Sequence, residues 1–362
     1  MPTPLNNVSI EDILNQIKPE IRQMGGYVTP PQGEVRAKLN QNENPFDFPL
    51  EWKQELAEYM PTISWARYPA NEAPGIRTLL ADRFGFAPDQ IMLGNGSNQL
   101  LYTIILSVIG QGDKLLMAPP SFSLFDLVGT LFQGEVTQVL LNDDFTINQS
   151  EFLKQATDAK LILLCSPNNP TGNEIPLEFL EKLLNSTSAI VMWDEAYGEF
   201  TDQTAINLID KYPNLVVSKT FSKAFGLAGL RIGYFLGDSR IIAEIRKANL
   251  PYNLNLFSER VCKQILDNDA WVQKHVQIIV DESEKLYQAM QQINGLHVYP
   301  SKANFLLFKV DDGSGVLQSL QDKGILVRNM GSYPLLANHL RVTVGTPEEN
   351  QIFIDGIKEV LS

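Results

Sequence analysis

Two lysines and an arginine follow a short apolar run in the stretch SKTFSKAFGLAGLRIGYF, residues 218–235. Lys219, Lys223 and Arg231 stand there among small residues and glycines, directly after the run NLVV. Lysine and arginine are seldom buried unless another group pairs with them. The segment is therefore either a solvated turn or one wall of a site that needs positive charge.

Two other apolar runs also end in side chains that can do chemistry. Residues 160–165 lead into SPNNPTG, which supplies Asn169, and residues 189–193 lead into DEAYGEF, which supplies Asp194 and Tyr197. Each piece alone has an ordinary explanation, since SPNNPTG suits a turn and an acid after a strand often caps a helix. Ligands of open α/β sheets, however, bind beyond the carboxyl ends of strands. Together the pieces predict that an acid, an amide, a phenol and an amine converge on one small molecule.

A glycine-containing loop opens a helical pattern in IMLGNGSNQLLYTIIL, residues 91–106. Backbone N–H groups at a helix N-terminus favour a phosphate, and the small residues Gly96 and Ser97 allow close approach. The loop lacks the third glycine of a dinucleotide fingerprint, and no clear acidic residue ends a second strand about twenty positions further on. The sequence therefore predicts a phosphate site without a dinucleotide.

Candidate strands and candidate helices alternate along the middle of the chain, and these elements must position the side chains named above. The candidate strands are residues 114–120, 135–141, 160–170, 189–195, 214–220 and 231–237. Helical spacing marks the candidate helices 99–110, 176–186 and 238–249. This alternation predicts an α/β domain built on a mainly parallel sheet.

The C-terminal third has a different pattern. A long helical pattern runs from about residue 258 to residue 293, and β-like segments follow at residues 297–300, 304–310, 325–329 and 340–345. We interpret this part as a smaller α+β domain. The predicted division is an N-terminal arm of residues 1–45 that joins the small domain, a large domain of residues 46–254, and a small domain of residues 255–362.

Composition limits the partners and the compartment. The 362 residues carry a formal net charge of −13, which argues against nucleic acid or an anionic membrane as the main partner. Two cysteines, Cys165 and Cys262, and three scattered histidines predict neither a disulfide framework nor a metal site. The N-terminus lacks a signal-peptide pattern, and the longest apolar stretch is too short to span a bilayer. We expect a cytoplasmic protein that binds a small molecule.

The order of the motifs carries a resemblance. SPNNPTG, the strand ending in DEAY and SKTFSKAFGLAGLRIGY resemble the fold type I, class I/II aminotransferases, which use pyridoxal phosphate. KLNQNENPF, WARYPA, GNGS and LRVTVGTPEEN resemble, more narrowly, the histidinol-phosphate aminotransferases. The resemblance extends over nearly the whole chain. It implies a large domain with a mainly parallel sheet and a smaller α+β domain.

The resemblance also implies roles for residues around the cofactor ring. Lys223 matches the lysine that forms the Schiff base with pyridoxal phosphate, whereas Lys219 falls outside the motif. The residues alone do not choose between these two lysines. Asp194 matches the carboxylate that pairs with the pyridine nitrogen. The remaining ring contacts implied are the donors Tyr197 and Asn169, and the stacking aromatic Phe122.

Further matches concern the cofactor phosphate and the substrate. The residues implied to hold the phosphate are Gly96, Ser97, Asn98, Thr220, Ser222 and Arg231, together with Tyr68 from the neighbouring subunit of a homodimer. The residues implied to bind substrate are Tyr27, Asn42, Asn169, Arg328 and Arg341. The expected reaction is a ping-pong transfer of an amino group between L-histidinol phosphate and 2-oxoglutarate in histidine biosynthesis, with glutamate as the other amino acid.

Several alternatives remain open at this point. A threonine-phosphate decarboxylase and an aromatic amino-acid aminotransferase share most of these motifs. A nicotinamide-dependent oxidoreductase would account for the α/β pattern, and a non-catalytic binding protein would account for a cleft. Only the first two share the pyridoxal phosphate chemistry.

Overall fold

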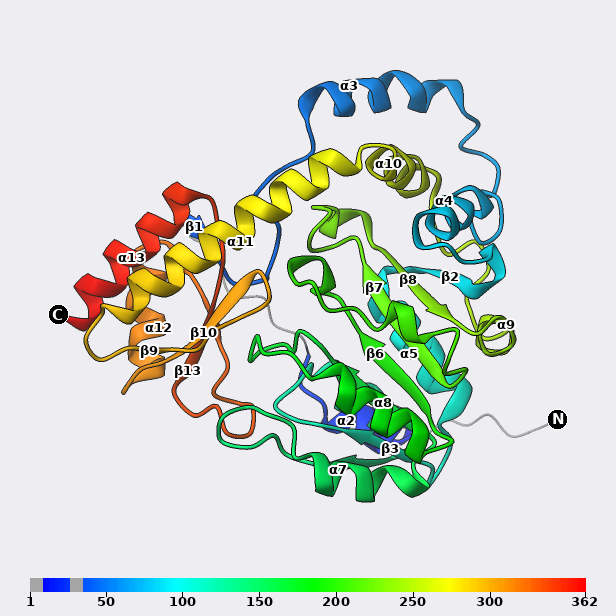
Figure 1. Cartoon of the computed structure of the whole chain (residues 1–362), viewed down its shortest axis with the longest axis horizontal. Helices are drawn as coiled ribbons and strands as arrows, with labels where there is room; N and C mark the ends of the chain where they lie inside the picture. The colour runs from blue at the N-terminus through cyan, green and yellow to red at the C-terminus, as the bar shows by residue number, and fades with distance from the viewer. Residues whose placement is uncertain (1–8, 27–34) are drawn as a thin grey trace.

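A computed structural model describes residues 9–26 and 35–362. Its largest sheet has seven strands in the order β2-β8-β7-β6-β5-β3-β4 (Figure 1). Neighbouring strands run parallel except around β8, which is antiparallel to β2 and β7. The mainly parallel sheet predicted from the sequence is therefore confirmed. The strands are β2 (Ile91–Asn95), β3 (Lys114–Met117), β4 (Glu135–Gln138), β5 (Leu161–Cys165), β6 (Ile190–Asp194), β7 (Leu215–Thr220) and β8 (Ile232–Gly237).

Helices cover both faces of this sheet. Along β5, Leu161 and Leu163 pack into one hydrophobic core with α5, α6 and α9, whereas Ile162 and Leu164 pack into a second core with α7 and α8. Successive strand side chains point to opposite faces, so a strand buried on both sides is apolar throughout. The helices named here are α5 (Gly96–Val108), α6 (Leu124–Leu131), α7 (Gln149–Gln155), α8 (Leu177–Ser186) and α9 (Ser239–Arg246).

Two smaller sheets lie beside the large one. An antiparallel sheet has the order β12-β13-β10-β9, and a two-stranded parallel ladder joins β1 to β11. The ladder pairs Ala37 with Ile325, so the segment after the N-terminal helices lies against the C-terminal part of the chain. The strands are β1 (Ala37–Lys38), β9 (His297–Val298), β10 (Phe305–Lys309), β11 (Ile325–Leu326), β12 (Arg328–Asn329) and β13 (His339–Thr343).

The remaining helices frame these sheets. The long helix α11 extends from the small sheet toward the large one (Figure 1), and its buried side chains join the core that the two sheets share. The helices are α1 (Ile10–Leu14), α2 (Pro19–Gln23), α3 (Leu50–Tyr59), α4 (Pro74–Phe84), α10 (Leu256–Leu266), α11 (Asp269–Gln291), α12 (Gly313–Asp322) and α13 (Pro347–Leu361). Among the described residues, no helix combines the length and the apolar character needed to cross a membrane.

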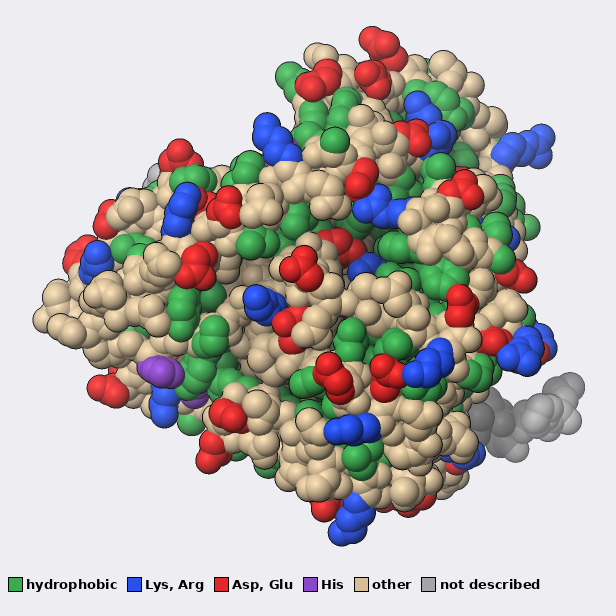
Figure 2. Space-filling model, in the orientation of Figure 1, with side chains coloured by type: hydrophobic (Ala, Val, Ile, Leu, Met, Phe, Trp, Pro, Cys, Tyr) green, Lys and Arg blue, Asp and Glu red, His purple; other side chains and the backbone are tan. Residues whose placement is uncertain are grey.

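Three elements differ from the sequence-based expectation. Residues 325–329, expected as one β-like segment, form β11 in the two-stranded ladder and β12 in the four-stranded sheet. Residues 91–95, interpreted as part of a loop, form the edge strand β2. The helical pattern after residue 258 is two helices, because α10 ends at Leu266 and α11 begins at Asp269. Figure 2 shows acidic and basic side chains interspersed over the face in view.

Candidate active site

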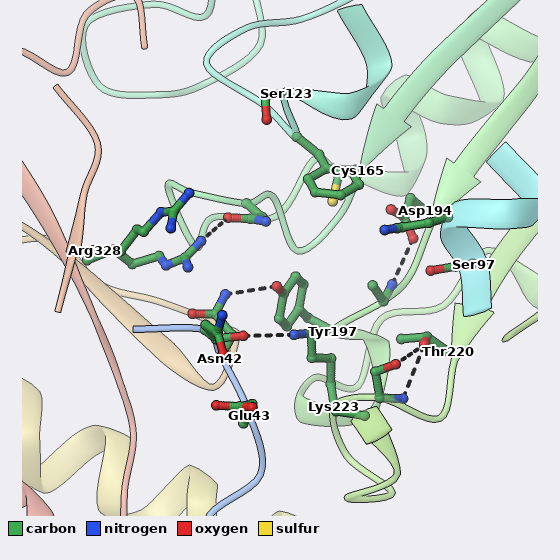
Figure 3. A pocket seen from close by; sticks show the side chains of 18 of the residues that line it. Asn42, Glu43, Ser97, Ser123, Cys165, Asp194, Tyr197, Thr220, Lys223 and Arg328 are labelled. Atoms are coloured by element: carbon green, nitrogen blue, oxygen red, sulfur yellow. Dashed lines mark hydrogen bonds between the residues drawn. The ribbon is translucent and has the colours of Figure 1, made fainter. Parts of the chain in front are cut away.

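A cavity of about 360 Å³ lies where the carboxyl ends of β5, β6 and β7 face the small sheet (Figure 3). The three predicted strand ends meet here because these strands are parallel neighbours, with Cys165 opposite Asp194 and Asp194 opposite Ser218. The predicted residues that line the cavity are Asn42, Ser97, Asn98, Phe122, Asn169, Asp194, Tyr197, Thr220, Ser222, Lys223, Arg231, Arg328 and Arg341.

Asp194 is the last residue of β6 and is buried. One of its carboxylate oxygens, Oδ1, accepts a hydrogen bond from the backbone N–H of Ala196 at 3.1 Å. Burial raises the pKa of Asp194 to about 7, with a smaller contribution from the neighbouring Glu195 carboxylate. The site therefore holds a carboxyl group that ionises near neutral pH and would gain from a cationic partner.

Lys223 follows β7 and donates from Nζ to the backbone carbonyl of Gln41 at 3.1 Å. Its Nζ lies 5.9 Å from the centre of the Tyr197 ring. Burial lowers the pKa of Lys223 to about 7, and the nearby positive charge of Arg341 contributes to the lowering. A lysine in this state has a large neutral fraction at neutral pH, which a nucleophile or a general base requires.

One end of the cavity is built to receive an anion. The N-terminus of α5 supplies Ser97 and Asn98, and Arg231 and Ser222 face it from the loop after β7. Gly96 has a φ of +76°, and a Cβ there would lie 2.6 Å from a guanidinium nitrogen of Arg231, so only glycine lets the arginine approach this closely. Helix N–H groups, a guanidinium and hydroxyls together suit a phosphate.

The opposite end carries two arginines from the small sheet. Arg328 on β12 and Arg341 on β13 are directly opposite in the antiparallel register. Arg341 donates from Nη1 to Asn169 Oδ1 at 2.6 Å and from Nη2 to the carbonyl of Asn40 at 3.2 Å. Like charges at opposed positions of a sheet repel each other, so an anion at this end of the cavity would relieve the repulsion.

A segment near the N-terminus closes the third side of the cavity. Asn42 donates from Nδ2 to the hydroxyl of Tyr197 at 2.8 Å, and its backbone N–H donates to Thr343 at 2.9 Å. Because the Tyr197 oxygen is the acceptor in this contact, its own proton stays available to another acceptor. Burial raises the pKa of Tyr197, which keeps the phenol protonated.

Three predicted residues lie elsewhere. Gly96 stands beside the cavity, where its lack of a side chain makes room for Arg231. Tyr68 does not line the cavity of its own chain; it is 82% exposed and stacks on Tyr252 with 4.6 Å between ring centres. Tyr27 lies outside the described residues.

Several lining residues were not predicted from the sequence: Asn40, Gln41, Glu43, Ser123, Cys165, Ala196, Ala228, Met330 and Tyr333. Asn40, Gln41 and Glu43 flank Asn42 in the motif KLNQNENPF, so the whole motif could have been nominated. Gln41 contacts Lys223 through its backbone carbonyl. Because every residue type has this group, the sequence does not indicate the contact.

Comparison with known proteins identifies the family. Residues 36–357 match the family described as aminotransferase class I and II. The chain belongs to this family. A histidinol-phosphate aminotransferase of Pelodictyon phaeoclathratiforme is 39% identical over 351 residues, which cover 96% of this chain and 99% of the relative. One from Chlorobaculum tepidum is 36% identical over 347 residues, covering 95% of this chain and 100% of the relative.

The fold is also that of a solved aminotransferase. The crystal structure of histidinol-phosphate aminotransferase from Sinorhizobium meliloti in complex with pyridoxal 5′-phosphate matches with a TM-score of 0.86 and 22% identity. The match covers 96% of this chain and 97% of that one. The fold type I prediction is confirmed, and the nicotinamide and non-catalytic alternatives are excluded by the family.

The cofactor of this aminotransferase is pyridoxal phosphate, and the cavity fits it. The cradle formed by Gly96, Arg231 and the N-terminus of α5 suits the phosphate dianion. The lysine with the lowered pKa and the buried carboxyl group lie at the same cavity, as an aldehyde and a ring nitrogen require. The described residues of the lining therefore include groups suited to the phosphate, the aldehyde and the ring nitrogen of the cofactor.

Proposed function

We propose that this aminotransferase moves an amino group between L-histidinol phosphate and 2-oxoglutarate in a ping-pong cycle. The observation that carries the proposal is the opposed pair Arg328 and Arg341, which lines the cavity at the end away from the phosphate cradle. A second anion site distinct from the cofactor's own suits a substrate that carries a phosphate. The names of the relatives that are 36–39% identical agree with this substrate.

The arginine pair also suits the second half-reaction. A planar guanidinium binds a carboxylate or a phosphate through paired N–H donors. Arg341 lies closer to the ring contacts, since it bonds Asn169, and we assign it to the anion of either substrate. Arg328, on the outer strand β12 of the small sheet, is assigned mainly to the substrate phosphate.

The roles proposed around the cofactor follow from protonation. When bound, pyridoxal phosphate supplies an electron sink for the bonds at the substrate α-carbon. Asp194 would hold the proton on the ring nitrogen, and Tyr197 and Asn169 would donate to the ring 3-oxygen. Phe122 would lie against the ring. The phosphate contacts would come from the cradle and from Thr220 and Ser222.

Lys223 is proposed to act twice through its amine. It would hold the cofactor covalently before substrate arrives, and its released neutral amine would then accept the proton from the substrate α-carbon. A pKa of about 7 suits both roles. At neutral pH a large fraction of the amine is neutral, so it can bond to the cofactor and accept a proton, and its conjugate acid can return that proton.

The oligomeric state, the domain boundaries and the cellular location are three further proposals. We propose a homodimer in which the exposed Tyr68 reaches the phosphate of the neighbouring site. We also propose that residues 46–254 form the large, cofactor-binding domain. Residues 255–362 would form the small domain, which the N-terminal arm of residues 1–45 joins. A cytoplasmic location is in line with the free thiols of Cys165 and Cys262.

A donor screen tests the substrate assignment. The purified holoenzyme is mixed in turn with histidinol phosphate, phenylalanine and threonine phosphate, and the loss of the lysine-bound cofactor band is followed. We expect histidinol phosphate to react fastest. Faster reaction with phenylalanine would favour an aromatic amino-acid aminotransferase, and release of carbon dioxide from threonine phosphate would favour the decarboxylase.

A further inference from the structure

Lys219 is a buried lysine that the proposed function does not use. It stands on β7 one residue before Thr220, is 4% exposed, and does not line the cavity that Thr220 lines. Successive residues of a strand point to opposite faces, so the ammonium of Lys219 lies on the side of β7 away from the cofactor site. A buried charge there requires partners.

Two carboxylates provide those partners. The Nζ atom of Lys219 lies 3.1 Å from Glu195 Oε2 and 3.0 Å from Glu199 Oε1. Glu195 is itself buried, and it also accepts from the hydroxyl of Thr204 at 2.8 Å and from the backbone N–H of Ala205 at 2.6 Å. Burial alone would lower the pKa of Lys219, but the two carboxylates, with a smaller contribution from Tyr234 opposite it on β8, outweigh burial and raise the pKa. The lysine is therefore charged.

Both acids belong to the turn that carries the proposed cofactor contacts. The turn comprises residues 194–200 and contains Asp194 and Tyr197 as well as Glu195 and Glu199. At Gly198 a Cβ would lie 2.9 Å from the Cβ of Glu195 and 3.0 Å from the Nζ of Lys219, so the turn closes tightly over the ammonium. Lys219 thus ties the turn to β7 from the side opposite the cavity.

The same three residues set the charge behind Asp194. One ammonium faces two carboxylates, which leaves a net charge of −1 in a buried place. The neighbouring Glu195 raises the pKa of Asp194 and Lys219 lowers it. From the other elements, Cys165 on β5, Tyr197 in the turn and Ser218 on β7 also face Asp194.

We propose that Lys219 is a positioning residue for the cofactor: with Glu195 and Glu199 it fixes the 194–200 turn, and its ammonium offsets part of the negative charge behind Asp194, so that this carboxylate is ionised when the ring nitrogen arrives. The inference rests on the proposed role of Asp194. It differs from a purely structural ion network, which would stabilise the fold without affecting the ionisation of Asp194.

The test measures binding of pyridoxamine 5′-phosphate, which cannot bond covalently to Lys223, to the full-length chain freed of cofactor. Equilibrium dialysis gives its dissociation constant from about pH 5.5 to about pH 8.5, and the ligand's own ionisation is common to all variants. The variants are Lys219→Met, Glu195→Gln and the double variant. Thermal unfolding is recorded for each.

The three variants have distinct expected results. Lys219→Met leaves a second uncompensated negative charge, so the pH midpoint of binding moves up, and the affinity at pH 7 falls by up to about tenfold when the midpoint rises by about one pH unit. Glu195→Gln removes a negative charge, so the midpoint moves down. The double variant has the same net charge as the wild type, so its midpoint returns toward the wild-type value.

Lys114→Met is the matched control. Lys114 begins β3, at the strand end opposite the cavity, and pairs with Asp158 at 2.6 Å. We expect it to lower thermal stability without moving the midpoint. Shifts in the same direction for Lys219→Met and Glu195→Gln, or loss of stability with an unmoved midpoint, would overturn the inference. Failure of the wild type to bind the probe would instead overturn the proposed function.

Discussion

The two halves of the active-site cavity are built in different ways. The half that we propose to bind the cofactor, the cofactor half, consists of the ends of β5, β6 and β7 and the N-terminus of α5, which are neighbours within one hydrogen-bonded sheet and its covering helix. The half that we propose to bind substrate, the substrate half, combines Arg328 and Arg341 from the small sheet with the segment around Asn42 near the N-terminus. Parts held by one sheet are in place before any ligand binds, whereas the other half depends on contacts between segments distant in sequence.

This difference predicts how substitutions divide between the two half-reactions. A change in the cofactor half alters chemistry that every substrate shares. A change in the substrate half alters recognition, so its effect depends on the anion that each substrate carries. The hydrogen bond between Arg341 and Asn169 joins the two halves. Substitution of Arg341 should therefore affect both the shared chemistry and the recognition of each substrate.

The largest effect is expected for Lys223→Ala. The amine of Lys223 is proposed both to anchor the cofactor covalently and to act as the base at the substrate α-carbon, so turnover without it should fall at least about 10⁴-fold with either substrate. Borohydride reduction followed by mass spectrometry should find cofactor attached to the wild type and none attached to the variant. Lys182→Ala, on α8, serves as the control. Attachment that persisted in Lys223→Ala and vanished in Lys219→Met would reverse the assignment of the two lysines.

Asp194→Ala comes next in size. The ring nitrogen would lose the carboxylate that is proposed to keep it protonated, and we expect a loss of turnover of about 10³-fold or more, equivalent to about 4 kcal/mol of barrier. Single-turnover measurements should show equal losses with histidinol phosphate and with glutamate, because both depend on the same ring. A loss confined to one substrate would contradict the separation of the two halves.

Sequence patterns alone indicated which strand ends meet at the cavity, but they did not indicate how the small sheet contributes to it. Asp194 and Asn169 could be nominated because they stand at or shortly after the ends of buried strands, and parallel strands bring their ends together. The edge strand β2 was missed because IMLGN is short and ends in Gly-Asn, and it pairs only with β8 among the described strands. The break after Leu266 was missed because the apolar pattern continues across it.

Other features have no local signal at all. The choice of Lys223 over Lys219 came from the resemblance, since both lysines stand in the same polar segment at the end of one apolar run. The opposition of Arg328 and Arg341 depends on the register of β12 and β13, which a loop of several residues sets. The carbonyl of Gln41 that accepts from Lys223 is common to every residue type.

The pH dependence of stability gives a third prediction, on the ligand-free protein. The pKa of Asp194 is raised to about 7 in the fold from an ordinary value of 3.8. The folded state therefore retains a proton that the unfolded chain releases, and stability is lost as the pH rises from about 4 to about 7, by up to about 1.4 kcal/mol per pH unit. Asp194→Asn has no such loss. Urea unfolding at several pH values measures the free energy of unfolding of both proteins. The stability of Asp194→Asn relative to the wild type should increase between about pH 4 and about pH 7 and stay constant at higher pH. A constant difference would mean that Asp194 is not buried as described.

Arg328→Ala is expected to separate the substrates. Removal of a charge-assisted contact costs about 1.5 to 3 kcal/mol, so reaction with histidinol phosphate should slow by about tenfold or more. Reaction with glutamate should change less, whereas Arg341→Ala should impair both. Stopped-flow absorbance of each half-reaction provides the comparison. Equal losses in the two half-reactions of Arg328→Ala would remove the division of labour between the arginines.

The smallest effect is expected for Tyr68→Phe, which tests whether the cofactor half is complete within one chain. Tyr68 is 82% exposed and stacks on Tyr252, and the substitution keeps the ring while removing the hydroxyl. Loss of one hydrogen bond of about 0.5 to 1.5 kcal/mol predicts an affinity for pyridoxal phosphate that is weaker by about twofold to tenfold. Mixed dimers decide which site the hydroxyl serves. When a Tyr68→Phe chain is paired with a Lys223→Ala chain, the site that keeps its lysine belongs to the Tyr68→Phe chain but would receive the tyrosine hydroxyl from the other chain. Its affinity should therefore match the wild type, and a weakened affinity would place the hydroxyl in the site of its own chain.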